Sequence, residues 1–321
     1  MSATDLSAVL SNSLSLSSIL ILTALGLAIT FGVMRVINMA HGDMLMLGAY
    51  TGFVVSAPNY LHLNLFWAIP ISFLVVALIG YLMEVCLIRF LYGRPLDTLL
   101  ATWGVGMVLQ ETVKLAFGAN LQETHLPERL QGGWAIGDLT IPIYRVFIVG
   151  ITLLCLLVVY VWFYHTSFGL KIRAVVQNRS MASALGISTR RIDSMTFAFA
   201  TGLAGVAGCI LAHLYNIKYN MGADYIVEAF MVVILGGMGK LSGAIAAGVV
   251  IGTLDSFMAK LLSTQWVEKL ALAMGMTQEN WDRIIGSNSE VLASVLVLLI
   301  VIGFILARPS GLFASKERTY D

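Results

Sequence analysis

The chain has 321 residues, of which 58% are hydrophobic and only 12% are charged, and its formal net charge is +1. A soluble domain carries about 25% charged residues, so 19 basic and 18 acidic side chains are too few to cover a water-soluble protein of this length. The composition excludes soluble enzymes, disordered proteins and nucleic-acid binders, and the mean hydropathy of +0.86 indicates a membrane protein with several spans.

The first 17 residues contain Asp5 but no Lys or Arg. The basic region that opens a cleaved signal peptide is therefore missing. We expect residues 1–17 to stay attached as a non-cytoplasmic N-terminal segment.

Nine apolar runs follow along the chain, and a membrane-spanning helix needs about 20 apolar residues. The runs cover residues 18–34, 43–57, 63–91, 96–117, 143–164, 194–215, 227–238, 241–262 and 289–307. Two of them, 43–57 and 227–238, are too short to cross alone, and each lies beside a break that contains glycine. The pattern lacks the alternation of a β-barrel and predicts an all-α integral membrane protein with eight or nine transmembrane or re-entrant helices.

The charged residues of the loops predict an orientation. Basic residues gather in the loop 165–193 and after the last run, whereas acids exceed bases in the loop 118–142. By the positive-inside rule, the loop 165–193 and the tail 314–321 are cytoplasmic. The loops 118–142 and 263–288 are then outer loops, and the C-terminus is cytoplasmic.

The two halves of the chain share a layout, which predicts a pseudo-symmetric bundle. Each half has a short apolar run next to a break, at residues 35–42 in the first half and 235–240 in the second. Short, glycine-interrupted segments at matching places indicate a central transport site. The residues in the two breaks differ, so this relationship rests on layout alone.

The first break is the most polar stretch within the apolar regions. A charge at membrane depth costs about 2.5–3.5 kcal/mol on insertion scales, so such residues are rarely incidental. A loop at the membrane surface is the competing interpretation, above all for Asp43. The candidates for a substrate pathway are Asn38, His41, Asp43, Thr102, Gln110, Glu228, Gly236 and Gly237.

Small residues recur on two later runs. Gly202, Gly205 and Gly208 are spaced by three, and Gly248 and Gly252 by four. Such patterns let helix backbones approach closely in a membrane, so we expect helix packing or a subunit contact there.

The basic loop contains a second candidate site. Residues 175–188 read as a short amphipathic helix that ends at Gly186, and its apolar side suits docking into a groove on a cytoplasmic partner. A solvated basic loop is the alternative. The candidate docking residues are Gln177, Asn178, Met181, Ala182, Leu185 and Gly186.

Enzymatic motifs are missing from the sequence. The stretch 236–242 resembles a phosphate-binding loop, but Leu241 stands where Ser or Thr must follow the lysine. No metal-ligand spacing or catalytic motif occurs, and His41 and Asp43 are too close in sequence to share one helical face. We therefore expect neither catalysis, nor a metal, nor a bound cofactor on this chain.

These residues resemble a known family. The run 32–50 is similar to the first signature of the branched-chain amino acid and urea permeases of ABC transporters. Further segments resemble that family in the same order, namely 173–193, 201–208, 235–239 and 308–313. The resemblance predicts a permease domain over residues 18–313.

Within this family the sequence is most similar to the B-type permease subunit of urea transporters. The similarity lies in residues 37–42, 103–106, 177–179 and 220–233. Arg35 departs from the glycine expected there. Branched-chain or other amino acids are the alternative substrates, and urea, being neutral, would need no fixed counter-charge.

The resemblance implies an importer in a bacterial cytoplasmic (inner) membrane. This permease would pair with a paralogous permease, two cytoplasmic subunits that bind and hydrolyse ATP, and a periplasmic solute-binding protein. Closure of the ATP-binding subunits would move the helix at 175–188 and rock the two halves around the breaks. A stand-alone urea or amide channel is an alternative of a different class.

Overall fold

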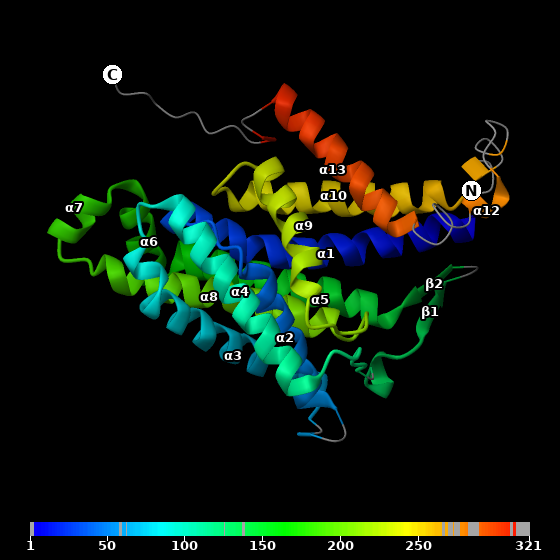
Figure 1. The fold of residues 1–321 in the computed structure, drawn as a ribbon, viewed down its shortest axis with the longest axis horizontal. Helices are drawn as coiled ribbons and strands as arrows, with labels where there is room; N and C mark the ends of the chain where they lie inside the picture. The colour runs from blue at the N-terminus through cyan, green and yellow to red at the C-terminus, as the bar shows by residue number, and fades with distance from the viewer. Residues whose placement is uncertain are drawn as a thin grey trace.

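Long helices account for most of the chain in a computed structural model of the protein (Figure 1). The structure describes residues 3–57, 60–61, 63–124, 126–136, 139–264, 267–268, 272, 277–281, 289–308 and 311–312. The predicted tail 314–321 and most of the predicted outer loop 263–288 lie outside these residues.

The helices differ widely in length along the chain. Those of the first half are α1 (Ala3–Met34), α2 (His41–Ser56), α3 (Leu65–Cys86), the 3-10 helix η1 (Ile88–Phe90), α4 (Pro95–Phe117), the 3-10 helix η2 (Glu128–Leu130) and α5 (Ile143–His165). Strands β1 (Gly133–Ile136) and β2 (Leu139–Pro142) precede α5. The remaining helices are α6 (Ser167–Gln177), α7 (Arg179–Ala184), α8 (Thr189–Leu211), α9 (Met221–Gly236), α10 (Leu241–Leu262), α12 (Gln278–Trp281) and α13 (Ser289–Ala307).

Two helices form the centre of the bundle. Among the described residues, five helices are long and apolar enough to cross a membrane: α1, α3, α5, α8 and α10. The apolar windows of α1 and α8 are 78% and 83% buried, whereas those of α3, α5 and α10 are 33%, 22% and 22% buried. The outer helices thus leave apolar side chains for lipid or a partner subunit. The predicted all-α membrane fold is confirmed, with a small antiparallel hairpin of β1 and β2 in the predicted outer loop 118–142.

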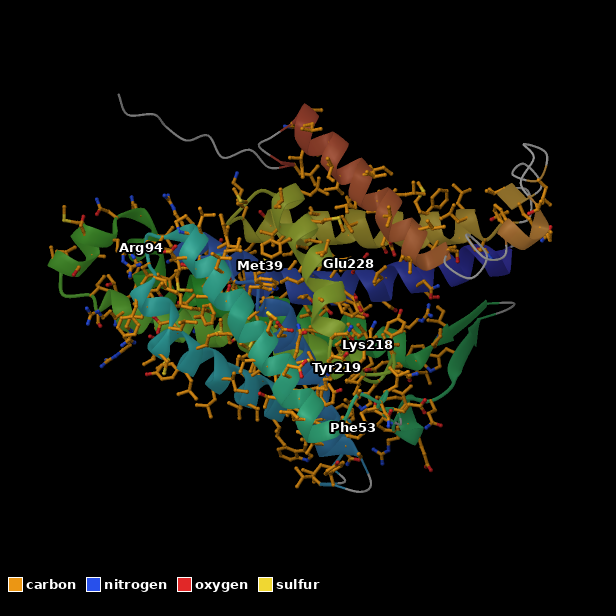
Figure 2. The ribbon with its side chains drawn as sticks, in the orientation of Figure 1. Met39, Phe53, Arg94, Lys218, Tyr219 and Glu228 are labelled. Carbon is orange, nitrogen blue, oxygen red and sulfur yellow. The ribbon has the colours of Figure 1, made fainter. Side chains whose placement is uncertain are left out.

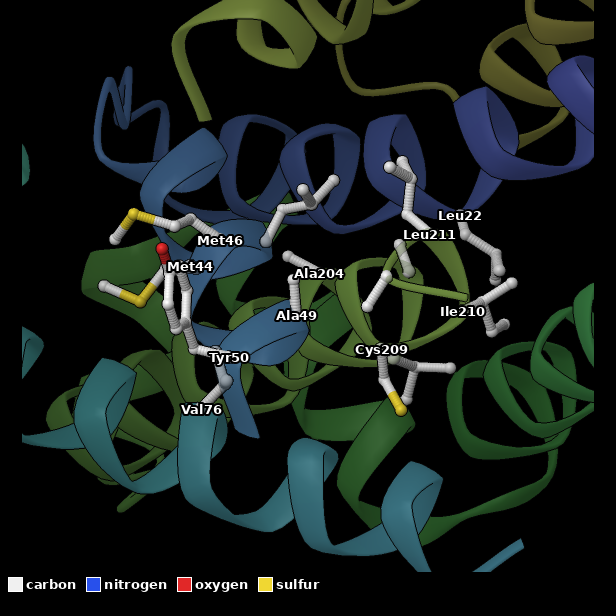
Figure 3. Close-up of a cluster of buried hydrophobic side chains, with 14 of the residues drawn as sticks. Leu22, Met44, Met46, Ala49, Tyr50, Val76, Ala204, Cys209, Ile210 and Leu211 are labelled. Carbon is white, nitrogen blue, oxygen red and sulfur yellow. The ribbon is translucent and has the colours of Figure 1, made fainter. Parts of the chain in front are cut away.

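Helix α2 is buried against α3 and α8, and its apolar side chains meet theirs in the main cluster (Figure 3). Glycines set the distance between these helices. A Cβ atom at Gly48 would lie 2.2 Å from the carbonyl oxygen of Gly205, and one at Gly208 would lie 1.8 Å from that of Leu45. The backbones of α2 and α8 are therefore in direct contact.

Helix α9 crosses the bundle instead of running along it. Figure 1 shows α9 lying across α1 and α10, which run side by side along the long axis. The helices α6 and α7 lie at one end of that axis and the hairpin of β1 and β2 at the other. We call these two ends the basic end and the hairpin end.

The first helix begins earlier than predicted. The apolar run was expected to start at residue 18, but α1 starts at Ala3 and includes most of the predicted N-terminal segment. Serine hydroxyls there donate to carbonyls one turn back, from Ser15 to Ser11 at 2.9 Å and from Ser18 to Leu14 at 2.7 Å. These bonds satisfy polar side chains within the helix, so a Ser-rich stretch continues it.

Candidate functional site

The first predicted break is a real interruption between α1 and α2. Helix α1 ends at Met34, and Arg35 has a φ of 54°, in the left-handed region that favours glycine. Helix α2 begins at His41. The break therefore lies where the sequence predicted it, and Arg35 takes up the conformation that suits the glycine expected there.

Helix α4 holds this break through three positions spaced by four. The hydroxyl of Thr102 accepts a hydrogen bond from the Met39 N–H at 3.1 Å, and the Gln110 side-chain amide donates to Asp43 Oδ1 at 2.8 Å. Between them, a Cβ atom at Gly106 would lie 2.2 Å from Asp43 Oδ2. Four predicted pathway candidates, from segments far apart in sequence, are thus neighbours in space: Asn38, Asp43, Thr102 and Gln110.

Two buried side chains of the break have unpaired polar atoms. Asn38 and His41 are both 0% exposed. Asn38 Oδ1 accepts from the Ala40 N–H at 3.1 Å, but its Nδ2 has no partner in the described part of the chain. His41 Nε2 donates to the Thr23 carbonyl at 2.9 Å, which leaves Nδ1 as an unpaired acceptor. The break therefore offers one free donor and one free acceptor to a small polar group.

Glycines bring both predicted breaks into close contact with other helices: Gly239 of the second break lies against Gly32 near the end of α1, where a Cβ at 32 would lie 2.9 Å from the Gly239 Cα. Gly42 at the start of α2 packs against Gly222 at the start of α9, where a Cβ at 42 would lie 2.1 Å from the Gly222 carbonyl oxygen. Gly236 packs against Gly243 of α10, and Gly237 has a φ of 95° that ends α9. The first break thus meets the start of α9, because α9 crosses the bundle.

A cavity of about 1010 Å³ opens in the hairpin-end half. Helices α1, α9, α10 and α13 line it, together with the segment between α8 and α9. Glu228 lies on α9 beside this cavity, and Lys218 lies just before the same helix (Figure 2). Glu228 lines this cavity, whereas Asn38, His41, Asp43, Thr102 and Gln110 are not among its lining residues.

The walls of this cavity carry charges of both signs. Lys218 pairs with Asp224 at 2.8 Å, and Arg145 donates to Ser11 at 3.0 Å. Asp255 accepts from Ser294 at 3.0 Å. Glu228 Oε2 is buried and has no hydrogen-bond partner among the residues that the structure describes. Apolar side chains complete the wall, among them Leu16, Ile19, Val227, Met231 and Leu298.

The sequence analysis missed Arg145, Lys218 and Asp224 as members of one site. Asp224 stands four residues before Glu228, so the two share a face of α9, and this spacing could have linked them. Arg145 and Lys218 lie in different segments and carry no such signal. In the described part of the chain, His, Cys, Asp and Glu form no group able to hold a metal ion.

The basic loop contains two helices where one was predicted. Gln177 ends α6, and Asn178 caps α7 by accepting from the Met181 N–H at 3.0 Å. The extended backbone of Asn178 breaks the expected helix at 175–188. Ala182 is 3% exposed and faces inward, whereas Met181 and Leu185 are 58% and 76% exposed.

The remaining predicted positions are glycines, and all of them except Gly186 lie at close contacts. Gly186, with a φ of 81°, follows α7. A Cβ at Gly202 would lie 2.7 Å from the Phe73 ring, and one at Gly205 would lie 2.7 Å from the Ser72 carbonyl oxygen. On α10, Gly248 and Gly252 lie against Ile21 and Ser17 of α1. These helical glycines thus sit where helices touch.

The chain matches one family model over residues 9–306, described as the branched-chain amino acid transport system / permease component. It is 28% identical over 276 residues to the high-affinity branched-chain amino acid transport system permease protein LivH of Escherichia coli, covering 82% of this chain and 89% of that one. It is 27% identical to BraD of Pseudomonas aeruginosa, again over 82% of this chain and 89% of that one. It is 24% identical to LivM of E. coli over 74% of this chain and 60% of LivM. These similarities favour the amino-acid alternative over urea.

Proposed function

The chain belongs to the family of permease components of branched-chain amino acid transport systems, and on that premise we propose that it forms the translocation pathway of an ATP-driven importer for branched-chain amino acids. The family consists of transporter subunits, so the chain is a membrane permease and not an enzyme. In this proposal it pairs with a paralogous permease in a bacterial inner membrane, with the basic end and the C-terminus in the cytoplasm. ATP is bound and hydrolysed by two partner subunits, and a periplasmic binding protein delivers the substrate.

The charged cavity of the hairpin-end half is the observation that carries the choice of substrate. An amino acid brings an ammonium group, a carboxylate and, in this class, a branched apolar side chain. The cavity offers acids, bases and apolar walls together, with Glu228 and Arg145 among its charged residues. Urea has no charge and would make no use of these acidic and basic groups.

The first break supports the assignment of a pathway through the centre of the bundle. Interrupted helices at mid-membrane are tolerated where the freed polar groups are buried in protein or line a cavity. The free Asn38 Nδ2 and His41 Nδ1 supply a donor and an acceptor beyond the cavity. Since both are fully buried, access to them requires the helices to move.

Uptake of labelled leucine and labelled urea by cells with and without the chain tests this proposal. All partner subunits are present, and each label is measured with an excess of the other compound. Deletion should abolish leucine uptake and leave urea uptake unchanged. Loss of urea uptake alone would overturn the proposal that the substrate is a branched-chain amino acid. Leucine entry without ATP hydrolysis would favour a stand-alone channel.

A further inference from the structure

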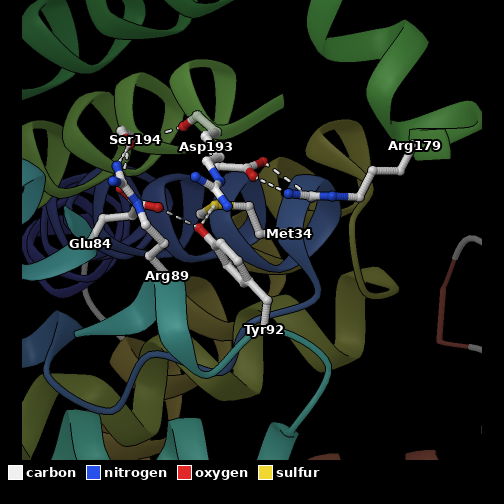
Figure 4. A network of polar contacts seen from close by, with 8 residues as sticks. Met34, Glu84, Arg89, Tyr92, Arg179, Asp193 and Ser194 are labelled. Carbon is white, nitrogen blue, oxygen red and sulfur yellow. Dashed lines mark hydrogen bonds and ion pairs between the residues drawn. The ribbon is translucent and has the colours of Figure 1, made fainter. Parts of the chain in front are cut away.

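A network of polar side chains joins the short helix α7 to the interior of the bundle (Figure 4). Its members come from α3, the segment around η1, α7 and α8. They are Glu84, Arg89, Tyr92, Arg179, Asp193 and Ser194. The network lies at the basic end, between the docking surface proposed for the ATP-binding partner and the helices of the membrane bundle.

Arg179 attaches α7 to α8. It is the first residue of α7, and both guanidinium Nη atoms donate to the two carboxylate oxygens of Asp193, with Nη1 at 3.4 Å from Oδ1. The Asp193 side chain is 0% exposed and that of Arg179 is 44% exposed. A two-point contact of this kind fixes orientation as well as distance. Since α7 has only six residues, this ion pair and the buried Ala182 together hold α7 against the bundle.

Tyr92 connects the same arginine to α3. The guanidinium of Arg179 lies over the Tyr92 ring, 5.4 Å from its centroid, and the Tyr92 hydroxyl donates to Glu84 Oε1 at 2.8 Å. Burial, with the nearby carboxylates of Asp193 and Glu84, raises the pKa of Tyr92 well above its usual value. The hydroxyl therefore stays protonated and remains a donor.

Glu84 completes the connection between α3 and α8. Its side chain is 0% exposed, and its Oε2 accepts from the Ser194 hydroxyl and from Arg89 Nη2, the latter at 3.4 Å. A buried carboxylate with several donors holds their helices together, because separating them would leave a charge unpaired. Tyr92 thus bridges two buried acids, Glu84 through its hydroxyl and Asp193 through Arg179.

Helix α8 leads from this network to the first break. Ala200 comes seven positions after Asp193, about 10 Å along a helix. A Cβ atom at Gly26 of α1 would lie 2.4 Å from the Ala200 carbonyl oxygen and 2.8 Å from His41 Cε1. Because of this tight contact, a movement of α8 toward α1 must displace α1 or His41.

We propose that Arg179 and Tyr92 are positioning residues that clamp α7 to α8 and α3, so that a displacement of α7 reaches the first break. This inference rests on the proposed function, in which the ATP-binding partner moves α7. Without the clamp, α7 shifts against the bundle and the motion is lost before it reaches His41.

The test measures leucine molecules imported per ATP hydrolysed by the whole complex in proteoliposomes. Arg179→Gln removes the ion pair, Arg179→Lys keeps the charge, and Tyr92→Phe removes the hydroxyl contacts with Glu84 and Met34 but keeps the ring. Arg191→Gln is the matched control, because Arg191 lies in the same basic segment and is exposed. Arg179→Gln should lower the import ratio by at least about fivefold while basal ATP hydrolysis and co-purification persist. Arg179→Lys should recover part of the ratio, and Arg191→Gln should match the wild type.

The outcomes separate this inference from the function on which it rests. If the wild-type complex imports no leucine, the proposed function fails before any variant is compared. If the wild type imports leucine and assembled Arg179→Gln has the wild-type ratio, the clamp is rejected and the function stands. If the Arg179→Gln complex does not assemble, the test uses Tyr92→Phe instead. A wild-type ratio of leucine imported to ATP hydrolysed in Tyr92→Phe also rejects the clamp.

Discussion

Gly42, the second residue of α2, lies directly against Gly222, the second residue of α9. A Cβ atom at Gly42 would stand 2.1 Å from the carbonyl oxygen of Gly222, and one at Gly222 would stand 2.6 Å from that of Gly42. The backbones touch, so two short helices from different halves of the chain meet at their first turns. This contact places the start of α9, which borders the charged cavity, next to the first break.

The Gly42 contact predicts that Gly42→Ala abolishes leucine uptake. The methyl group has backbone on the opposite side, so the two helices must separate, and overpacking of this kind costs about 1–3 kcal/mol. Uptake by cells and the thermal midpoint of the purified chain check both effects. Gly303→Ala is the control, because the space beside Gly303 on α13 is open. Normal uptake by Gly42→Ala would show that the two helices are free to separate.

Helix α4 allows a comparison of two glycines on the same helix. A methyl group at Gly106 would lie 2.2 Å from Asp43 Oδ2, whereas nothing lies within 4 Å of one at Gly104. Gly106→Ala should displace Asp43 from Gln110 and reduce uptake. Gly104→Ala should leave uptake unchanged and stabilise the helix by about 0.5–1 kcal/mol. Equal uptake by the two variants would contradict the role of α4 in holding the first break.

Hydropathy and composition predicted the helices and the first break, because both depend on residues that are neighbours in sequence. The sequence shows that Thr102, Gly106 and Gln110 are spaced by four residues and share one helical face. Their partners Met39 and Asp43, however, lie more than 60 residues away in the sequence. Contacts of this kind depend on how α4 packs against α2 and the first break, which no local pattern encodes. Asn178 shows the same limit at short range, since only its extended backbone divides α6 from α7.

Glu228 is expected to recognise the ammonium group of the substrate. Its Oε2 is buried without a hydrogen-bond partner in the charged cavity. Glu228→Gln keeps the shape of the side chain but replaces its carboxyl group with an amide, which cannot carry a negative charge beside the ammonium group, and losing a charged hydrogen bond costs about 1.5–3 kcal/mol. The apparent KM for leucine uptake should rise by about tenfold or more.

The matched control for Glu228 is Asp224→Asn on the same face of α9. Asp224 already pairs with Lys218 at 2.8 Å and is 56% exposed. Its neutralisation should change the apparent KM for leucine by less than about threefold, as expected for an exposed ion pair worth about 0–1 kcal/mol. A larger effect of Asp224→Asn than of Glu228→Gln would mean that the ammonium group binds at Asp224 and would contradict the role of Glu228.

His213, in the segment between α8 and α9, makes the stability of the chain depend on pH. Burial lowers the pKa of His213, and the hydrogen bond from Nδ1 to the Cys209 carbonyl, at 2.9 Å, opposes this only in part. The unfolded chain, with a histidine pKa of about 6.5, therefore binds the proton more tightly than the folded chain. The folded chain therefore keeps the contribution of neutral His213 to its stability above pH of about 6.5. It loses this contribution as the pH falls toward the lower pKa of His213 in the folded chain.

The variant His213→Asn should remove this part of the acid sensitivity, because asparagine does not titrate and its amide can still donate to Cys209. Thermal midpoints of the purified chain at pH of about 7.5 and 5.5 measure the effect. The drop between the two pH values should be smaller in His213→Asn than in the wild type. His165→Asn, at the exposed end of α5, should keep the wild-type drop. An unchanged drop in His213→Asn would mean that the folded chain accepts the proton at His213 without penalty.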